Sequence, residues 1–442
     1  MRIDKASRTL LNKSGSTEIW GETIVKEKQD KIFAIRAKRL VDGTGRILND
    51  ALVTFQHSKI LEVGTKSEVA VPSDAEIINA HGATIMPGLI DAHIHFLGPS
   101  KGAPSPLSML AAPRELRAIR GAVDATKYLD WGFTTVGEMG SKFGIAVKMA
   151  VEEGTIAGPK ILAAGMPLTQ TGGHLDVYKF LPRDLTDVME AIIVDGVDEV
   201  RKAVRSQIRA GADIVKICVT GGVTDKGSIP SAAEFSVDEI KTAVDEAHRR
   251  GLKTQAHAQG NEGIKNAIKG GIDAIAHGFY LDDEACEMMI QKNIGFVPTL
   301  GIGEIVLQMG QEGGMPDYAI KKMKDAHSSH MLSFRMAYEK GVKIAMGTDM
   351  TGEDAFPHGK NAWELEVMVR QGMSNMDAIM ASTKNASEIL GVGESRGTLE
   401  EGKQADMLLI QGNPLEDIKV LQNRQNILLV VKDGRIEVRR GV

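Results

Sequence analysis

Four histidines and one aspartate have the side chains of metal ligands and lie where apolar runs of the chain end. His93 and His95 are two residues apart at the end of one such run. Alternate residues of a strand face the same side, so both imidazoles can reach one ion. His257, His277 and Asp349 each end or follow a further apolar run. Imidazole and carboxylate donors together are typical of zinc and similar divalent ions, so the set predicts a metal site.

A lysine in an apolar run also needs a chemical explanation. Lys216 lies inside Ile214–Cys218, and an isolated ammonium in an apolar interior is costly. One interpretation is a core ion pair with a carboxylate. The other is a carbamate, formed from CO2 and the neutral amine, which would act as a carboxylate-like arm able to bridge two cations. The position of Lys216 at the end of a predicted barrel strand favours the carbamate.

Strand-like runs alternate with segments of helical period between residues 86 and 390, which is the pattern of βα units around a parallel sheet. Ser236, with Glu239 three residues later, and Ser374 mark two helix starts. Eight runs predict an α/β fold with a closed (β/α)8 TIM-type barrel, whose chemistry lies at the C-terminal ends of the strands. The runs span residues 84–91, 134–136, 160–164, 214–218, 254–258, 274–277, 295–299 and 343–346.

The two ends of the chain have a different pattern, with short β runs separated by turn residues. Residues 32–85 contain four such runs, and residues 386–442 contain two. The last run is followed by Asp433-Gly434, a tight hairpin signal. We therefore predict a β-sandwich domain formed by residues 32–85 and 386–442 together, and a catalytic barrel over residues 86–385.

Composition excludes several classes of protein. The 442 residues carry 53 Lys and Arg against 58 Asp and Glu, a net charge of -5, which excludes a basic nucleic-acid binder. Two cysteines, no apolar leader and no long apolar window predict a cytoplasmic protein without a membrane segment. Residues 1–31 are predicted to be a polar N-terminal extension, either an arm on a neighbouring subunit or a tail. We expect a homo-oligomer that acts on a small molecule.

The motifs together resemble those of the amidohydrolase superfamily over nearly the whole chain. The likeness is carried by residues 86–95 (MPGLIDAHIH), 215–222 (VKICVTGG) and 346–349 (MGTD), and by the return into the β-sandwich at 397–410. Within the superfamily the chain is similar to imidazolonepropionase-related proteins and Xaa-Pro dipeptidases. This resemblance implies that one metal is held by His93, His95 and Asp349, the other by His257 and His277, and that carboxylated Lys216 bridges them. Imidazolonepropionase has one metal and no such lysine, so Lys216 favours the two-metal side.

A two-metal centre, with zinc expected, implies hydrolysis by a shared water that the cations activate as hydroxide. Asp349 would take the proton and pass it to the departing nitrogen, and His277 would assist catalysis besides holding metal. In the resembled branch a Gly-Gly-His element helps polarise the scissile group, which gives that role to His174; a plain surface loop is the alternative. Gln259 lies where dipeptidase relatives carry a tyrosine for the substrate carboxylate.

The other histidines are less informative. His358, after the eighth run, is kept as a candidate substrate contact, with a surface position as the alternative. His327 and His330 are three apart on a helical segment. That spacing could hold a metal but is more typical of a solvated face, so no function is assigned to them. No function is predicted for the three remaining histidines at positions 57, 81 and 248.

The predicted function is therefore a two-metal amidohydrolase that cleaves a C–N bond of dipeptides or N-acyl amino acids. Hydrolysis of non-peptide amides, carbamates or aryl ureas is the leading alternative, because fold does not decide substrate. A one-metal aminohydrolase that releases ammonia is a further alternative, and Lys216 speaks against it. A scaffold protein that lost its chemistry would lack ligands, and none is missing.

Overall fold

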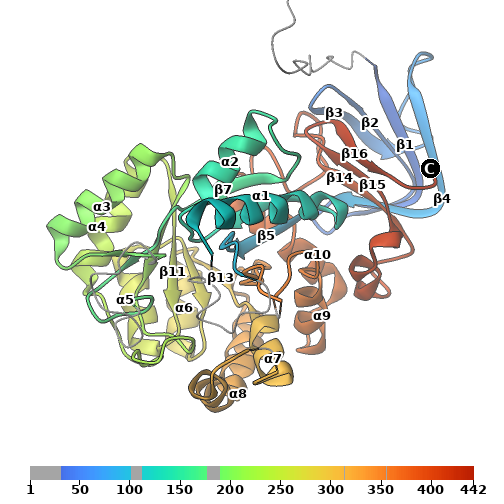
Figure 1. Cartoon of the computed structure of the whole chain (residues 1–442). Helices are drawn as coiled ribbons and strands as arrows, with labels where there is room; N and C mark the ends of the chain where they lie inside the picture. The colour runs from blue at the N-terminus through green and yellow to red at the C-terminus, as the bar shows by residue number, and fades with distance from the viewer. Residues whose placement is uncertain (1–30, 101–111, 177–189, 313, 355) are drawn as a thin grey trace, which may run out of the picture.

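The computed structural model describes residues 31–100, 112–176, 190–312, 314–354 and 356–442. The predicted N-terminal extension lies outside these ranges except for Lys31, whose ammonium pairs with Glu76. The described chain forms a barrel surrounded by helices and, beside it, a separate β-sheet domain (Figure 1). Among the described residues, none of the helices has both the length and the apolar character needed to cross a membrane.

Strands from both ends of the chain form one seven-stranded sheet in the order β16-β15-β14-β4-β1-β2-β3. β1 is parallel to β4, and the other neighbours are antiparallel. Because β14 pairs with β4, the C-terminal segment joins the N-terminal one in the middle of the sheet (Figure 1). The strands are β1 (Phe33–Val41), β2 (Ile47–Gln56), β3 (Lys59–Thr65), β4 (Glu76–Pro87), β14 (Met407–Gln411), β15 (Ile427–Lys432) and β16 (Arg435–Arg439).

The hairpin between β15 and β16 confirms the predicted turn at Asp433-Gly434. Both residues have positive φ, 49° and 72°, as a tight hairpin of this kind requires. A Cβ at Gly434 would lie 1.4 Å from the carbonyl oxygen of His57, so only glycine fits. The predicted fold class, a barrel with a β domain from both chain ends, is confirmed.

The barrel strands are nearly continuously buried, as expected for parallel strands covered by helices. β5, β6 and β7 pair in parallel, as do β10, β11, β12 and β13. The bond from the Asp213 N–H to the Ala163 carbonyl, 2.8 Å, joins the two groups. The strands are β5 (Leu89–Ile94), β6 (Phe133–Glu138), β7 (Lys160–Ala163), β8 (Leu168–Thr169), β9 (Ile192–Ile193), β10 (Ile214–Cys218), β11 (Lys253–Ala258), β12 (Ala274–His277) and β13 (Gly295–Val297).

Two predicted barrel strands were wrong in detail. The run at 84–91 is divided between β4 and β5, with Gly88 between them, where a Cβ would lie 2.1 Å from Thr134 Oγ1. The run at 343–346 is not a regular strand. It closes the barrel through single bonds, with the Phe296 N–H donating to the Lys343 carbonyl (2.8 Å) and the Ala92 N–H to the Met346 carbonyl (2.9 Å).

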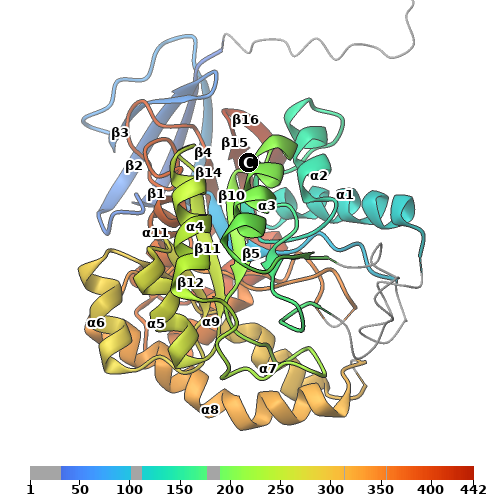
Figure 2. The ribbon, with the colours of Figure 1, turned by 90° about the vertical axis from the view of Figure 1, so that its left-hand side faces the viewer.

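Helices cover the outside of the barrel, with α4, α5, α6 and the long α8 around it in Figure 2. Ser236 and Glu239 form the predicted capping box at the start of α4, and Ser374 caps α10. The helices are α1 (Arg114–Asp130), α2 (Gly144–Glu152), α3 (Val197–Ala210), α4 (Val237–His248), α5 (Asn261–Gly270), α6 (Asp283–Gln291), α7 (Leu300–Met309), α8 (Asp317–Lys340), α9 (Trp363–Arg370), α10 (Asn375–Ala381) and α11 (Lys384–Ile389), with 3-10 turns η3 (Ile418–Gln422) and η4 (Arg424–Asn426).

The chain returns from the barrel to the sheet through a buried ion cluster. Arg396, 8% exposed, pairs with Asp406 just before β14 and with Asp433 in the β15–β16 turn. Loss of the guanidinium would leave buried Asp406 without its ion-pair partner, and would leave Asp433 with Lys432 alone, at 3.0 Å. The cluster therefore fixes the C-terminal strands to the segment that follows α11.

Replacing Arg396 by Met should lower the free energy of unfolding by about 3–5 kcal/mol, the usual result of removing one partner of a buried ion pair. Arg370→Met is the matched control, because Arg370 is 44% exposed and pairs with Glu304 at the surface. That control should cost less than about 1 kcal/mol. Urea unfolding of both variants measures the difference; equal losses would contradict a structural role for the cluster.

Candidate metal centre

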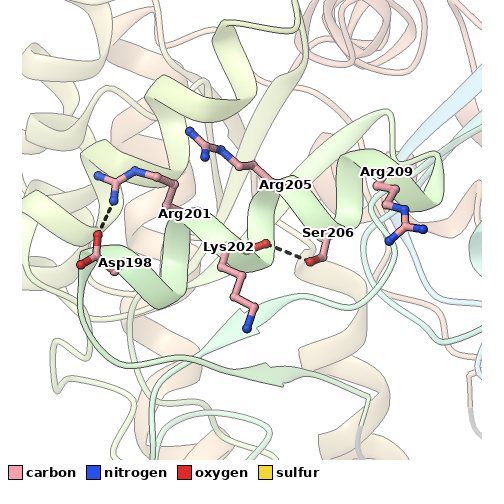
Figure 3. Close-up of a pocket in the computed structure, with 6 residues that line it drawn as sticks. All are labelled: Asp198, Arg201, Lys202, Arg205, Ser206 and Arg209. Carbon is pink, nitrogen blue, oxygen red and sulfur yellow. Dashed lines mark hydrogen bonds and ion pairs between the residues drawn. The ribbon is translucent and has the colours of Figure 1, made fainter.

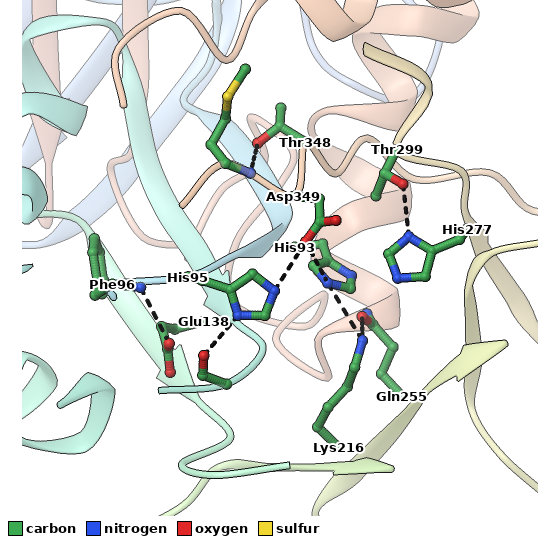
Figure 4. Close-up of polar contacts among 12 residues, drawn as sticks. His93, His95, Phe96, Glu138, Lys216, Gln255, His277, Thr299, Thr348 and Asp349 are labelled. Atoms are coloured by element: carbon green, nitrogen blue, oxygen red, sulfur yellow. Dashed lines mark hydrogen bonds and ion pairs between the residues drawn. The ribbon is translucent and has the colours of Figure 1, made fainter. Parts of the chain in front are cut away.

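Three predicted ligands meet at the C-terminal end of the barrel. His93 lies on β5, His95 directly follows it, and Asp349 lies three residues after the closing segment. Asp349 Oδ1 is 3.5 Å from His93 Nε2 and 3.0 Å from His95 Nε2 (Figure 4). One potential ligand atom from each of the three lies within 4.8 Å of the others. The structure thus groups the first predicted ligand set.

The hydrogen bonds of His95 show that positive charge belongs at this point. Its Nδ1 donates to the Gly140 carbonyl at 2.7 Å, so Nε2 presents a lone pair to Asp349 unless a proton or a cation lies between them. Burial alone would lower the pKa of His95, but the hydrogen bond and charge of Asp349 raise it. A divalent ion meets the same need, and the donor set fits one.

The imidazoles of His257 and His277 lie next to this group. The rings of His277 and His93 are 5.1 Å apart, and those of His277 and His257 are 4.6 Å apart. Burial, followed by nearby cationic groups, holds the pKa of all three rings well below the usual range. They are therefore neutral at pH 7, as metal ligation requires. His277 Nδ1 contacts Thr299 Oγ1 at 2.9 Å, and His257 Nε2 donates to the Gly221 carbonyl at 3.1 Å.

Lys216 points into the same space from β10 and is 4% exposed (Figure 4). Its Nζ lies 3.4 Å from His93 Nε2 and 3.5 Å from Gln255 Oε1. Within the described part of the chain no carboxylate lies within ion-pair distance of Nζ. Lys216 therefore does not form the core ion pair that was the other interpretation of its burial. Burial lowers the pKa of Lys216 to about 8. The neutral amine that reacts with CO2 is therefore accessible near neutral pH.

Three residues at this end of the barrel have left-handed backbone conformations that side chains other than glycine seldom adopt. His277 has φ 70°, Asp349 φ 60° and Thr299 φ 51°. Each such residue costs about 1–3 kcal/mol and persists only where its surroundings over-determine it, as commonly happens at functional sites. These three residues end or follow barrel strands or the segment that closes the barrel.

A buried carboxylate, Asp91, makes hydrogen bonds to the backbone and side chains next to the metal ligands. Asp91 accepts bonds from the His93 N–H (3.1 Å), from the Thr348 hydroxyl (2.7 Å) and from Asn361 Nδ2 (2.7 Å). Burial raises the pKa of Asp91 to about 6 in spite of these donors. Because Thr348 precedes Asp349, this network ties both halves of the first ligand set together. Sequence reasoning missed it, although Asp91 lies two residues before His93.

Glu138 is a second carboxyl that sequence reasoning missed. It ends β6, is fully buried, and accepts the Phe96 N–H at 3.4 Å beside His95 (Figure 4). Burial raises its pKa to about 7, so it has an appreciable neutral fraction near pH 7. Inspection of the residue that ends each strand, the rule that found the other ligands, would have found it. The same rule would have found Thr299, which ends the seventh predicted run.

His174 lies at the centre and not on a plain surface loop. It is 7% exposed, and its ring stacks on that of His257 with centroids 4.0 Å apart and planes at 22°. Its Nδ1 bonds to Asp225, and its backbone N–H donates to Glu234 at 2.9 Å. The catalytic contribution of His174 stays a prediction.

The two predicted substrate contacts differ in their surroundings. Gln259 is 3% exposed, and its Oε1 has no hydrogen-bond partner among the described residues. His358 is buried behind His95: its Nε2 donates to the His95 carbonyl (3.2 Å), and its Nδ1 accepts from the Tyr128 hydroxyl (2.5 Å). With both ring nitrogens bonded, His358 supports the backbone of a ligand and offers a substrate no free nitrogen. Gln259 keeps a free acceptor.

The interpretation of His327 and His330 as a solvated face was wrong for His330. This ring is fully buried, and its Nε2 donates to the Pro298 carbonyl at 2.8 Å. It also packs on Phe279, with ring centroids 4.1 Å apart. The residue lies on the side of α8 that packs against the barrel, so its spacing reflects packing and not solvation.

A depression of about 370 Å³ on the outer side of α3 has different chemistry (Figure 3). Arg201 and Arg205 both pair with Glu246 of α4, so part of its positive charge is neutralised. It has no histidine, cysteine or carboxylate cluster of the kind that binds metal. Its lining is Asp198, Arg201, Lys202, Arg205, Ser206 and Arg209. This depression therefore lacks the ligand set that lies at the barrel end.

Comparison with known proteins agrees with this geometry. Residues 84–436 match the family model described as "Amidohydrolase family". Ochratoxinase from Aspergillus niger is 34% identical over 434 residues, covering 93% of this chain and 88% of that protein. Its crystal structure superposes with a TM-score of 0.85 at 33% identity, covering 93% of this chain and 96% of the other.

Two further solved structures are similar over almost their full length. A Xaa-Pro dipeptidase with methionine bound in its active site has a TM-score of 0.83 and 33% identity, covering 92% of this chain and 100% of the other. A prolidase in complex with N-methylphosphonate-L-proline has a TM-score of 0.84 and 30% identity, covering 93% and 100%. With the ligand geometry described above, these matches show that the chain belongs to the amidohydrolase family, as a metal-dependent enzyme that acts on C–N bonds.

Proposed function

We propose that the protein is a two-metal hydrolase of dipeptides or N-acyl amino acids. The observation that carries the proposal is the position of Lys216, which is buried 3.4 Å from a metal-ligand imidazole with no carboxylate to neutralise it among the described residues. A carbamate on its Nζ would supply the missing negative charge and two oxygens, one for each cation. His257 and His277 would hold the second ion.

The chain's own groups account for the proton movements. Bound divalent cations would polarise the scissile carbonyl and lower the pKa of a water molecule. Asp349 is 26% exposed, so one face of its carboxylate is open to a water or substrate beside the ligands. It would accept the proton of that water and deliver it to the leaving nitrogen. His174, against His257, would contact the scissile group.

The names of the relatives support an amide-type substrate without deciding which. Ochratoxinase, Xaa-Pro dipeptidase and prolidase are each about one-third identical to this chain. Gln259 lies buried two residues after His257, and its Oε1 has no hydrogen-bond partner among the described residues, so its amide is available to a polar group on the substrate at that side. We propose a free carboxylate there, received by the amide N–H of Gln259.

Metal content tests the two-ion centre directly. After reconstitution with zinc and removal of excess metal, we expect about two ions per chain, because five protein ligands and a carbamate exceed what one tetrahedral ion binds. Inductively coupled plasma mass spectrometry gives the ratio. One ion per chain would favour the one-metal aminohydrolase instead.

Lys216→Ala should abolish hydrolysis and lower the bound metal to one ion or fewer per chain, because the bridging arm is gone. A short carboxylic acid in the buffer should restore part of both. Lys216→Arg should also fail, since a guanidinium stays protonated and forms no carbamate. Lys148→Met is the matched control: Lys148 is also buried but pairs with Asp213, so this variant should keep its metal. Wild-type turnover in Lys216→Ala would remove the carbamate from the mechanism.

A substrate panel tests the class of amide. An Xaa-Pro dipeptide, its C-terminal amide, an N-acetyl amino acid and ochratoxin should be compared with the zinc enzyme. We expect kcat/KM for the dipeptide to exceed that for its amide by about tenfold or more, since a hydrogen bond to a charged group contributes about 1.5–3 kcal/mol. Equal values would exclude carboxylate recognition. Turnover of none of them at full metal content would exclude the peptidase assignment.

A further inference from the structure

We propose that Asp225 is the positioning residue of His174, and that Lys322 of α8 holds the loop that carries Asp225. This inference rests on the proposed function, in which His174 contacts the scissile group. It concerns how the ring is held, and it assigns Asp225 and Lys322 no contact with substrate.

One carboxylate oxygen fixes the ring to its own loop. Asp225 Oδ2 accepts a bond from His174 Nδ1 and another, at 2.8 Å, from the N–H of Leu175. A carboxylate oxygen is an acceptor, so Nδ1 carries the hydrogen and the ring cannot rotate without breaking this bond. The carboxylate is 15% exposed, which limits competition from water.

The remaining contacts leave one ring nitrogen available. Glu234 accepts the backbone N–H of His174 at 2.9 Å, and a Cβ on Gly222 would lie 2.4 Å from the ring's Cε1. The ring is therefore packed against bare backbone, and it stacks on His257. Within the described ranges no hydrogen bond reaches His174 Nε2. This nitrogen is the one left to meet a substrate.

The Asp225 loop is itself held by a distant helix. Lys322 Nζ donates to the carbonyl of Gly222 (3.3 Å), to that of Ser228 (2.6 Å) and to that of Asp225. One turn earlier on α8, the Tyr318 hydroxyl donates to the Thr224 carbonyl at 3.0 Å. A cation that binds three carbonyls of one loop fixes its path more firmly than a neutral donor would. The 24-residue α8 thus anchors residues 222–228.

The alternative is that Asp225 only holds the His174 loop in place and does not position the ring. The chain offers a control residue for this alternative. Asp195 accepts bonds from the backbone N–H (3.0 Å) and hydroxyl (2.6 Å) of Thr171, three residues before His174. It holds the same loop without touching the ring. A tether effect would appear in Asp195→Asn as well as in Asp225→Asn, whereas a positioning effect would appear only in the second.

Kinetics on the zinc-loaded enzyme provide the first test. Asp225→Asn should lower kcat by about 10- to 100-fold, the range found when the outer partner of a functional histidine is removed, with KM little changed. Lys322→Met should lower kcat in the same direction. Asp195→Asn should keep wild-type kinetics. In a His174→Ala background Asp225→Asn should change kcat/KM by less than about twofold, because its effect passes through that ring. Equal effects in both backgrounds would overturn the proposal.

The second readout needs no substrate, so it separates this proposal from the proposed function. In protein with 15N-labelled histidine, the His174 ring signals are assigned by their loss in His174→Ala. Asp225→Asn should shift the Nδ1 signal, and Asp195→Asn should leave it in place. An unshifted signal in Asp225→Asn would overturn the proposal even in an active enzyme. A shifted signal in a zinc-loaded protein that cleaves no amide would uphold the positioning and refute the function.

Discussion

The closure of the barrel between β5 and residues 343–350 is the constraint on which the metal centre depends. The carbonyl of His93 accepts the N–H groups of both Thr348 (3.2 Å) and Asp349 (2.7 Å). These two bonds bring the imidazole at one end of the barrel sequence beside the carboxylate at the other. Because Asp349 has a left-handed backbone, its side chain turns back toward His93 and His95. Without this closure the ligands would lie on opposite edges of an open sheet.

A network of hydrogen bonds around the buried Asp91 carboxylate surrounds the closure. Asp91 is fully buried and receives donors from β5, from the Asp349 loop and from Asn361. Hydrogen bonds to one buried carboxylate can stabilise the fold by more than the sum of the separate bonds. The loss of any donor would leave a buried acceptor partly unsatisfied, which costs free energy. The network thereby stabilises the strained backbone at Asp349. The strained backbone of Asp349 and the hydrogen bonds of Asp91 that stabilise it are therefore close together in the structure.

The electrostatics of the centre are incomplete without cations. Four imidazoles, one lysine and one aspartate face one another, and burial keeps three of the rings neutral. Neutral imidazole nitrogens that converge on one space are able to bind a cation. The Glu138 carboxyl beside His95 adds to this preference. The centre is thus organised for divalent ions by the same burial that shapes the barrel.

The sequence by itself determined the barrel, the β domain and the candidate ligands, because these depend on local patterns. The assignment of His93, His95 and Asp349 to one ion came from the resemblance to the amidohydrolase superfamily. Apolar runs, capping residues such as Ser236 and the spacing of His93 and His95 are readable in one dimension. Tertiary structure alone decided the contacts between segments far apart in the chain. Examples are Asp225 on His174, Lys322 on a loop about 100 residues earlier, and the buried place of His330 and His358. No periodicity encodes such pairs, since they depend on which faces meet once the barrel has closed.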